Sequence, residues 1–232
     1  LSIAQLGDGF GTAEFGAFLP PSSAVVSGID PRTKQPFVNQ IFLGCTTGGA
    51  THAEDCWLTY LHVGNGGMCF IDSVELDELY QPIIVTDRRI VIDTEGAGRH
   101  RGAPSLQVEF GPLGGDIEVA YVSDGRLNPP RGVRNGSGGG GSDQFRRKPD
   151  GSKQQLEAAT TVLLKPGETI ISICCGGGGY GDPMLRDPQR VWEDVVDGWV
   201  SPDRARSVYG VVLTAANDLD VQATAQLRRG VN

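Results

Sequence analysis

The sequence lacks the apolar run that a membrane-spanning helix requires, because no hydrophobic stretch approaches roughly 18 residues. It also lacks an excess of positive charge: 28 acidic residues outnumber 20 lysines and arginines, giving a formal net charge of −8. A surface that binds nucleic-acid phosphates needs clustered basic residues. We therefore expect neither a membrane nor a nucleic acid as partner. The first ten residues lack the basic start and apolar core of a signal peptide.

Cysteines are few and irregularly spaced. The five cysteines are an odd number and include no C-x-x-C pair, so neither a disulfide framework nor a cysteine zinc site is indicated. A chain of 232 residues can bury a sizeable core without such cross-links. We expect reduced thiols in a cytoplasmic protein. Cys174 and Cys175 are expected to be buried small side chains, because no activating base is visible beside them in the sequence.

Glycine is abundant, with 34 residues, whereas hydrophobic residues make up only 39% of the chain. This composition favours many short strands joined by tight turns over a helical bundle. Apolar and β-branched runs predict strands at Phe37–Leu43, Arg88–Asp93, Leu106–Phe110, Ile117–Ser123, Thr160–Leu164 and Thr169–Cys175. Gly114-Gly115 predicts a hairpin between the third and the fourth of these strands.

Two helices near the carboxyl terminus are marked at both ends. Asp187-Pro188 has the residue types of a helix start, and Gly198 follows as the stop. Ser201-Pro202 begins a second helix that ends before Gly210. The expected fold class is therefore α+β, β-rich with many short strands and a carboxyl-terminal helix pair.

Composition also suggests how the chain is divided. Residues 1–66 form a glycine-rich portion and residues 67–232 a β-rich domain, or the whole chain 1–232 is one domain. Residues 128–151 are of low complexity and lack the G-K-[ST] ending of a phosphate-binding loop. We interpret this segment as a long surface loop between strands.

Four glycines, Gly176, Gly177, Gly178 and Gly179, link the last predicted strand to the helix pair. Without Cβ atoms they allow a neighbouring segment or a substrate to approach the backbone closely. We therefore expect Gly177→Val to abolish activity. Gly139→Val, in the expected surface loop, should be nearly silent.

Two carboxylates are candidates for catalysis. Glu75 and Asp77 lie in an acidic stretch, and paired carboxylates act as general acid and base when one of them is desolvated. The alternative is a solvated turn. Arg99 and Arg101 flank His100 and form either a clamp on an anionic substrate or ordinary structural ion pairs.

A third group combines His52, Asp55 and His62 within a short stretch. Imidazole and carboxylate ligands suit Zn or Mn. Their spacing, however, matches no helical H-x-x-x-H pattern, and no cysteine supplements them. We therefore expect no tightly bound metal on this chain.

Two blocks of sequence resemble the hydantoinase B/oxoprolinase family. One is GGGGYGDP at residues 176–183, followed by RDP and then DGWVS at residues 197–201. The other joins SVELDE at residues 73–78 to DTEGAGRHRG at residues 93–102, where the family usually shows D-S-x-G-A-G-x-x-R-G-G. Thr94 and Ala103 depart mildly from that pattern. Two blocks in the right order are far more specific than a glycine run alone.

The resemblance implies a role in an assembly. The family comprises large subunits of ATP-dependent hydantoinases, 5-oxoprolinases, lactamases and acetone or acetophenone carboxylases, and this chain is similar to their carboxyl-terminal half. The implied partners are an actin-like, hydantoinase-A-type ATP-binding subunit and the amino-terminal half of the same large subunit. A large apolar face is expected to be buried against a partner. ATP and Mg are expected on the partner, Zn or Mn in the amino-terminal half, and no cofactor on this chain.

The implied reaction is hydrolysis of a cyclic amide such as a hydantoin, oxoproline or a lactam. Carboxylation of a ketone is the alternative within the family. A subunit without catalytic groups of its own, which completes the active site of another chain, is the alternative of a different class.

Overall fold

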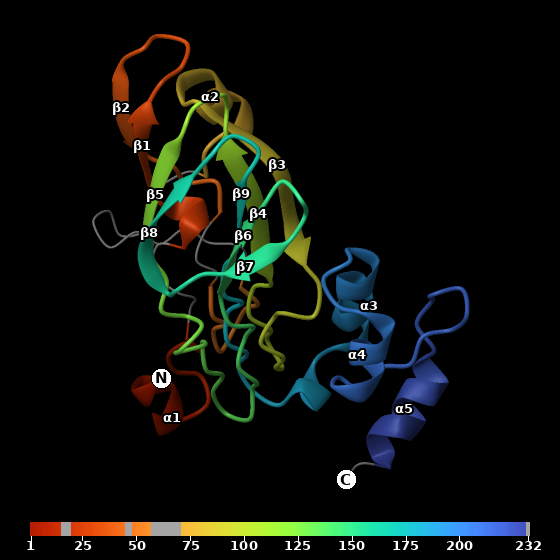
Figure 1. Ribbon diagram of the computed structural model, residues 1–232. Helices are drawn as coiled ribbons and strands as arrows, with labels where there is room; N and C mark the ends of the chain where they lie inside the picture. The colour runs from red at the N-terminus through yellow and green to blue at the C-terminus, as the bar shows by residue number, and fades with distance from the viewer. Residues whose placement is uncertain (15–19, 45–47, 57–70, 231–232) are drawn as a thin grey trace.

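The computed structural model describes residues 1–14, 20–44, 48–56 and 71–230, which form two antiparallel sheets with helices beside them (Figure 1). The four-stranded sheet has the order β2 (Pro36–Gln40), β1 (Val25–Ile29), β5 (Ile117–Val122) and β8 (Ala159–Leu164). The five-stranded sheet has the order β3 (Ile83–Val91), β4 (Ser105–Pro112), β9 (Thr169–Ile173), β6 (Asp143–Arg147) and β7 (Lys153–Gln155).

The main core lies between the inner faces of the two sheets. Along β5, Ile117, Val119 and Tyr121 are buried, whereas the residues between them are more exposed, as the period of two in a strand requires. Val119 lies opposite Val26 of β1 on one side and Val162 of β8 on the other. The same cluster includes residues of the five-stranded sheet, namely Ile83, Leu106, Val108, Phe110, Ile170 and, just after β9, Cys174.

The predicted α+β class is confirmed, and all six predicted strands are present with shifted ends. The largest shift is in β3, which begins at Ile83 rather than Arg88. Sequence patterns missed β1, β6 and β7. Because β6 pairs with β9 inside the five-stranded sheet, the interpretation of residues 128–151 as one surface loop is wrong.

The predicted hairpin at Gly114-Gly115 is also wrong. Gly114 has a positive φ of 82°, as expected in a turn. However, the strands on either side belong to different sheets: β4 pairs with β3 and β9, and β5 pairs with β1 and β8. The turn therefore connects the two layers of the sandwich. A glycine pair shows where the chain reverses but not which strands then pair.

The carboxyl-terminal helix pair is confirmed as α3 (Pro188–Val196) and α4 (Pro202–Ser207). The side chain of Asp187 accepts a hydrogen bond from the Gln189 N–H at 2.9 Å, and Ser201 accepts one from the Arg204 N–H at 3.1 Å. The other helices are α1 (Ser2–Leu6), α2 (Val74–Tyr80), α5 (Val221–Arg229) and the short η1 (Pro21–Ser23) and η2 (Pro183–Leu185). Among the described residues, no helix is long and apolar enough to cross a membrane.

Strand pairing crosses the boundary between the two portions of the chain. β1, from residues 1–66, lies beside β5, from residues 67–232, with Val25 opposite Ala120. A second buried cluster joins the helices to the segment after β3 through Ala97, Val191, Val200, Ala205, Tyr209 and Val211. Figure 1 shows α3, α4 and α5 beside one end of the sheets, whereas α2 lies at the opposite end.

Candidate functional site

The glycine run is packed backbone against backbone. Each residue from Gly176 to Gly179 lies so close to another segment that an added Cβ would come within 3.0 Å of a carbonyl oxygen. The four oxygens belong in turn to Thr94, Gly48, Arg131 and Ala97. Backbone hydrogen bonds hold the same crossing, such as Gly177 N–H to Ala103 O at 2.8 Å. We call the run and these surrounding segments the glycine crossing.

The second glycine-rich stretch forms part of this crossing. A Cβ on Gly136 would collide with Gly179, and one on Gly139 would collide with the carbonyl oxygens of Gly176 and Gly177. The expectation that Gly139→Val is nearly silent is therefore wrong. The physical reason is that two glycine segments bury each other here, and composition alone cannot distinguish such a pair from a solvated glycine loop.

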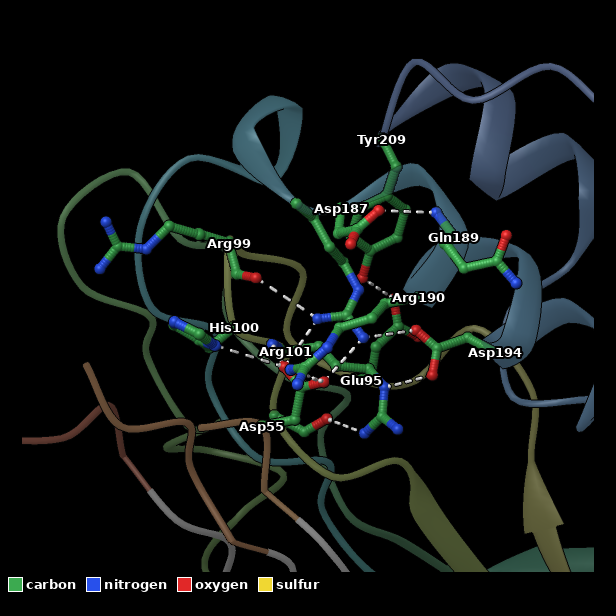
Figure 2. Close-up of polar contacts among 12 residues, drawn as sticks. Asp55, Glu95, Arg99, His100, Arg101, Asp187, Gln189, Arg190, Asp194 and Tyr209 are labelled. Carbon is green, nitrogen blue, oxygen red and sulfur yellow. Dashed lines mark hydrogen bonds and ion pairs between the residues drawn. The ribbon is translucent and has the colours of Figure 1, made fainter. Parts of the chain in front are cut away.

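Arg99 and Arg101 lie on different sides of the chain. Arg99 Nη2 is 3.1 Å from Asp8 Oδ1, and in Figure 2 its guanidinium group points away from the cluster around Asp55 and Asp194. Arg101 is buried, with its Nε 2.7 Å from Asp194 Oδ1 and its guanidinium carbon 4.3 Å from the centroid of the Trp199 ring. The structure does not bring the two guanidinium groups together on one anion.

Four charged side chains, three of them buried and one half-buried, form a cluster next to the glycine crossing. Arg186 Nη1 is 2.6 Å from Asp55 Oδ1, and Arg186 Nη2 is 2.9 Å from Asp194 Oδ2. Arg101 completes the cluster by donating a hydrogen bond to the other carboxylate oxygen of Asp194. We call Asp55, Arg101, Arg186 and Asp194 the ion cluster. It joins α3 to segments around residues 55 and 101.

Arg186 keeps Asp55 of the ion cluster charged. Burial would raise the pKa of Asp55, but the hydrogen bonds and charge of Arg186 outweigh it and hold that pKa below its ordinary value. Nearby His100 has a pKa lowered by burial, so it is neutral at pH 7 and contributes no positive charge. Because each charge in the cluster is paired with another, the cluster suits holding the elements together better than proton transfer.

A second buried acid secures α4. Glu95 Oε1 accepts hydrogen bonds from Arg204 Nε at 2.7 Å and from the Tyr209 hydroxyl at 2.9 Å. Burial raises the pKa of Glu95 despite the neighbouring Arg204 charge. Within the described residues, Glu95 Oε2 has no hydrogen-bond partner. Glu95 belongs to the DTEGAG block, so this block contacts both the glycine run and the helices.

Two pockets flank the glycine crossing. One, of about 320 Å³, is lined by Glu54, Asp55, Arg101, Arg186, Arg190, Glu193, Asp194 and Asp197. The other, of about 430 Å³, is lined by Asp8, Arg99, Arg134, Asn135, Gly181, Asp182 and Leu185. Arg134 is exposed, and its charge adds to the hydrogen bonds from Arg99 that lower the pKa of Asp8. The larger of these two pockets thus combines two arginines with Asp8 and Asp182, and among the described residues Arg134 has no direct ion pair or hydrogen bond.

The carboxylates Glu75 and Asp77 lie on α2, at the other end of the sheets from α3 and α4 (Figure 1). Glu75 is exposed, and its carboxylate accepts a hydrogen bond from Ser73 Oγ, which lowers the pKa of Glu75. Asp77 is buried. Burial, with a further contribution from Asp72, raises the pKa of Asp77 to about 6. Asp77 is therefore the candidate whose protonation changes near neutral pH.

The possible metal ligands are only partly described. His62 lies in residues 57–70, outside the described residues. Asp55 is engaged by Arg186 in the ion cluster. Across the described residues, no group of three His, Cys, Asp or Glu side chains is arranged to hold a metal ion. The side chains that can be assessed therefore do not fit a metal centre, and the absence of a tightly bound metal stays a prediction.

Sequence reasoning missed the residues that pair across long separations. Arg186 lies in the RDP sequence that begins α3, but nothing in the sequence points to Asp55, 131 residues earlier. The pair of Glu95 and Tyr209, 114 residues apart, is equally invisible. The only local sign of these pairs is that charged residues occur within a glycine-rich block or at the start of a helix.

Comparisons with known proteins agree with the motifs. Residues 13–183 match the family model described as hydantoinase B/oxoprolinase. The beta subunit of a caprolactamase from Pseudomonas jessenii is 31% identical over 205 residues, which cover 86% of this chain and 35% of that protein. A subunit of a putative D-/L-hydantoinase from a Pseudomonas species is 37% identical over 51 residues, which are 22% of this chain and 9% of that protein.

Solved structures show the same fold. The crystal structure of the ATP-dependent caprolactamase from Pseudomonas jessenii matches with a TM-score of 0.70 and 26% identity, over 94% of this chain and 38% of that one. A nucleotide-free acetone carboxylase structure matches with a TM-score of 0.74 and 20% identity, over 91% of this chain and 33% of that one. The chain thus spans about a third of the length of these three relatives, from 33% to 38%.

Proposed function

Because this chain belongs to the hydantoinase B/oxoprolinase family, we propose that it is part of an ATP-dependent enzyme that hydrolyses a cyclic amide. The observation that carries the proposal is the 31% identity to the caprolactamase beta subunit along 86% of the chain. For this reason we propose a lactam as the substrate in preference to a hydantoin or oxoproline. The acetone carboxylase match, at 20% identity, supports the fold alone and gives ketone carboxylation no separate support.

The proposed assembly has at least two further parts. ATP and Mg belong on a hydantoinase-A-like, actin-like subunit, since this sequence has no phosphate-binding G-K-[ST] loop. The remaining part of a hydantoinase-B-type subunit, corresponding to its amino-terminal half, supplies the metal, if the reaction uses Zn or Mn. A cytoplasmic location remains our expectation for the complex.

We assign two candidate roles to this chain's own residues. Asp77, with a pKa of about 6, suits proton transfer near neutral pH better than exposed Glu75, whose pKa is lowered. Arg134, with Arg99 in the same pocket, suits an anionic group of a ligand or intermediate. The glycine crossing fixes the segments that carry both arginines.

A second candidate function follows from the ion cluster. Asp55, Arg186 and Asp194 pair with one another, so these charged residues suit a structural role better than a catalytic one. This chain would then complete an active site whose catalytic groups lie mainly in other parts of the assembly. In that case Asp77→Asn and Glu75→Gln leave the turnover number close to that of the parent enzyme. If Asp77 transfers a proton, Asp77→Asn lowers it by roughly 100-fold or more.

The reaction is tested on the purified full assembly. Release of phosphate from ATP is measured with caprolactam, a hydantoin or 5-oxoproline, and separately with acetone plus bicarbonate. Cyclic-amide-dependent ATP hydrolysis with formation of the ring-opened amino acid supports the proposal. ATP turnover that requires bicarbonate and a ketone contradicts it and selects the carboxylase alternative.

A further inference from the structure

Helix α2 buries an acidic side chain and exposes apolar ones, the opposite of the usual arrangement on a surface helix. Its one buried residue is Asp77, which is 8% exposed. Leu76, Leu79 and Tyr80 are 53%, 61% and 69% exposed, and their spacing of three and four residues places them on one face of the helix. We call these three side chains the α2 face. A helix on the surface of a globular domain normally turns such a stripe toward the core.

The reversal is held in place by specific bonds. The Ser73 side chain accepts a hydrogen bond from the Leu76 N–H at the start of α2. At its end, Arg32 Nη1 donates to the carbonyl oxygen of Leu79 at 2.9 Å. The side chain of Glu78 accepts a hydrogen bond from the Val85 N–H at 2.8 Å, which fixes the helix to β3. The outward orientation of the α2 face is therefore imposed by contacts along the whole helix.

Two further exposed apolar side chains lie near α2 in the fold. Ile84, just after α2 on β3, is 43% exposed, and Leu113, which follows β4, is 42% exposed. Leu113 N–H donates to the carbonyl oxygen of Pro82, which places it at the same end of the sheets as α2. Contiguous exposed apolar patches of more than a few hundred Å² mark interaction sites in proteins.

The rim of the patch carries charges of both signs: Glu75 is exposed on α2, and Arg32, which pairs with Asp30, contacts the end of the helix. The Ser73 hydroxyl keeps the pKa of Glu75 below its ordinary value, so Glu75 is charged at pH 7. In a symmetric dimer through this face, a second copy of α2 would offer Glu75 no basic partner, because the helix has no basic residue. Charge complementarity instead favours an occupant with an apolar centre and a basic side chain opposite Glu75.

We propose that the α2 face binds the part of a hydantoinase-B-type subunit that lies outside this region. This inference rests on the proposed function, because it assumes that the chain works within such a subunit. The main support is length: in the caprolactamase structure the matching region is only 38% of the chain, so most of that chain lies outside the region and is available to contact it. The exposed apolar side chains of the α2 face are suited to such a contact.

The contact is tested by site-specific photocross-linking in the natural assembly. Benzoylphenylalanine is placed at Tyr80 and, in a separate variant, at Leu79. The matched control is Leu127, an exposed leucine outside α2. After irradiation, the cross-linked peptides are identified by mass spectrometry. We expect Tyr80 and Leu79 to join a peptide outside residues 1–232 that aligns with the rest of the caprolactamase beta subunit, with at least tenfold lower yield at Leu127.

Three outcomes overturn the inference: cross-links between two copies of this chain, cross-links to the ATP-binding subunit, or equal yields at Tyr80 and Leu127. Leu79→Asp provides a second measurement, since it should lower the yield of the Tyr80 cross-link at least tenfold, whereas Leu127→Asp should not. An unchanged cross-link yield in Leu79→Asp contradicts the proposal. Cross-linking reports contact without turnover, so an assembly that lacks cyclic amide hydrolysis but gives these cross-links refutes only the proposed reaction.

Discussion

Arg186 donates hydrogen bonds from both Nη atoms to Asp55, at 2.6 and 2.7 Å, across 131 residues of sequence. Its side chain is 1% exposed, and Asp194 on α3 accepts a further bond from it. Desolvating three charges is costly unless they pair with good geometry. The pairing therefore ties the beginning of α3 to the segment that carries Asp55, which lies outside the strands.

Removing the arginine from this cluster should be strongly destabilising. We expect Arg186→Leu to lower the free energy of unfolding by about 3–5 kcal/mol, because Asp55 and Asp194 lose the buried arginine that joins them and keep only Arg190 and Arg101 as their respective ion-pair partners. Arg190→Leu is the control: Arg190 is 3.5 Å from the same Asp55 but its side chain is 46% exposed, so its loss should cost less than about 1 kcal/mol. Urea denaturation of each variant measures the difference, and equal losses would contradict the prediction.

The glycine crossing should tolerate no side chain on either of its two glycine segments. Gly177→Ala and Gly139→Ala should each lower the free energy of unfolding by roughly 3 kcal/mol or more, since the added Cβ overlaps backbone atoms. Gly115→Ala is the matched control, because its nearest atom would be 3.4 Å away. Thermal melting of the three variants in the full complex gives the comparison. A mild Gly139→Ala variant would show that the second segment can move aside.

Stability should depend on the protonation of Asp77. Burial, then Asp72, raises its folded pKa from 3.8 to about 6, so the folded state binds this proton more tightly than the unfolded state. The resulting stabilisation is fully present below about pH 4 and is lost as the pH rises through about 6. Asp77→Asn should abolish this decline and be more stable than the parent at pH 7. Glu75→Gln should keep the decline, and denaturant midpoints between pH 4 and 7 check both.

Metal content should not depend on His52. The prediction of no tightly bound metal on this chain implies that His52→Ala leaves the Zn and Mn content of the purified assembly unchanged. Elemental analysis of parent and variant assemblies, normalised to protein, provides the measurement. Loss of one equivalent of metal in the variant would place a metal site on this chain.

Local patterns predicted the elements whose own residues determine them. Asp187-Pro188 and Ser201-Pro202 carry the capping side chain and the fixed φ of a helix start, so α3 and α4 were located correctly. The run of apolar and β-branched residues at Ile117–Ser123 likewise predicted β5. In contrast, β6 lies in a segment of polar and glycine residues, and it forms because β9 offers a partner, which no local pattern records.

The candidate site was predicted less completely, because it depends on contacts between distant segments. The glycine run was recognised as a place of close approach, but its partners, Thr94, Gly48 and Arg131, carry no mark of it. Arg99 and Arg101 were chosen together because they flank His100, yet one pairs with Asp8 and the other with Asp194. Residues two apart share a face of a regular strand, but residues 99 and 101 lie outside the regular strands, and the sequence gives no sign of that irregular backbone.

The glycine crossing restricts how this region can vary. Where side chains fill a core, an enlarged residue can be accommodated by a smaller one opposite it, so paired substitutions restore the packing. At Gly177 the opposing atom is the carbonyl oxygen of Gly48, and every residue type has that oxygen. No second substitution can make room, so a screen for suppressors of Gly177→Ala should return only reversions to glycine.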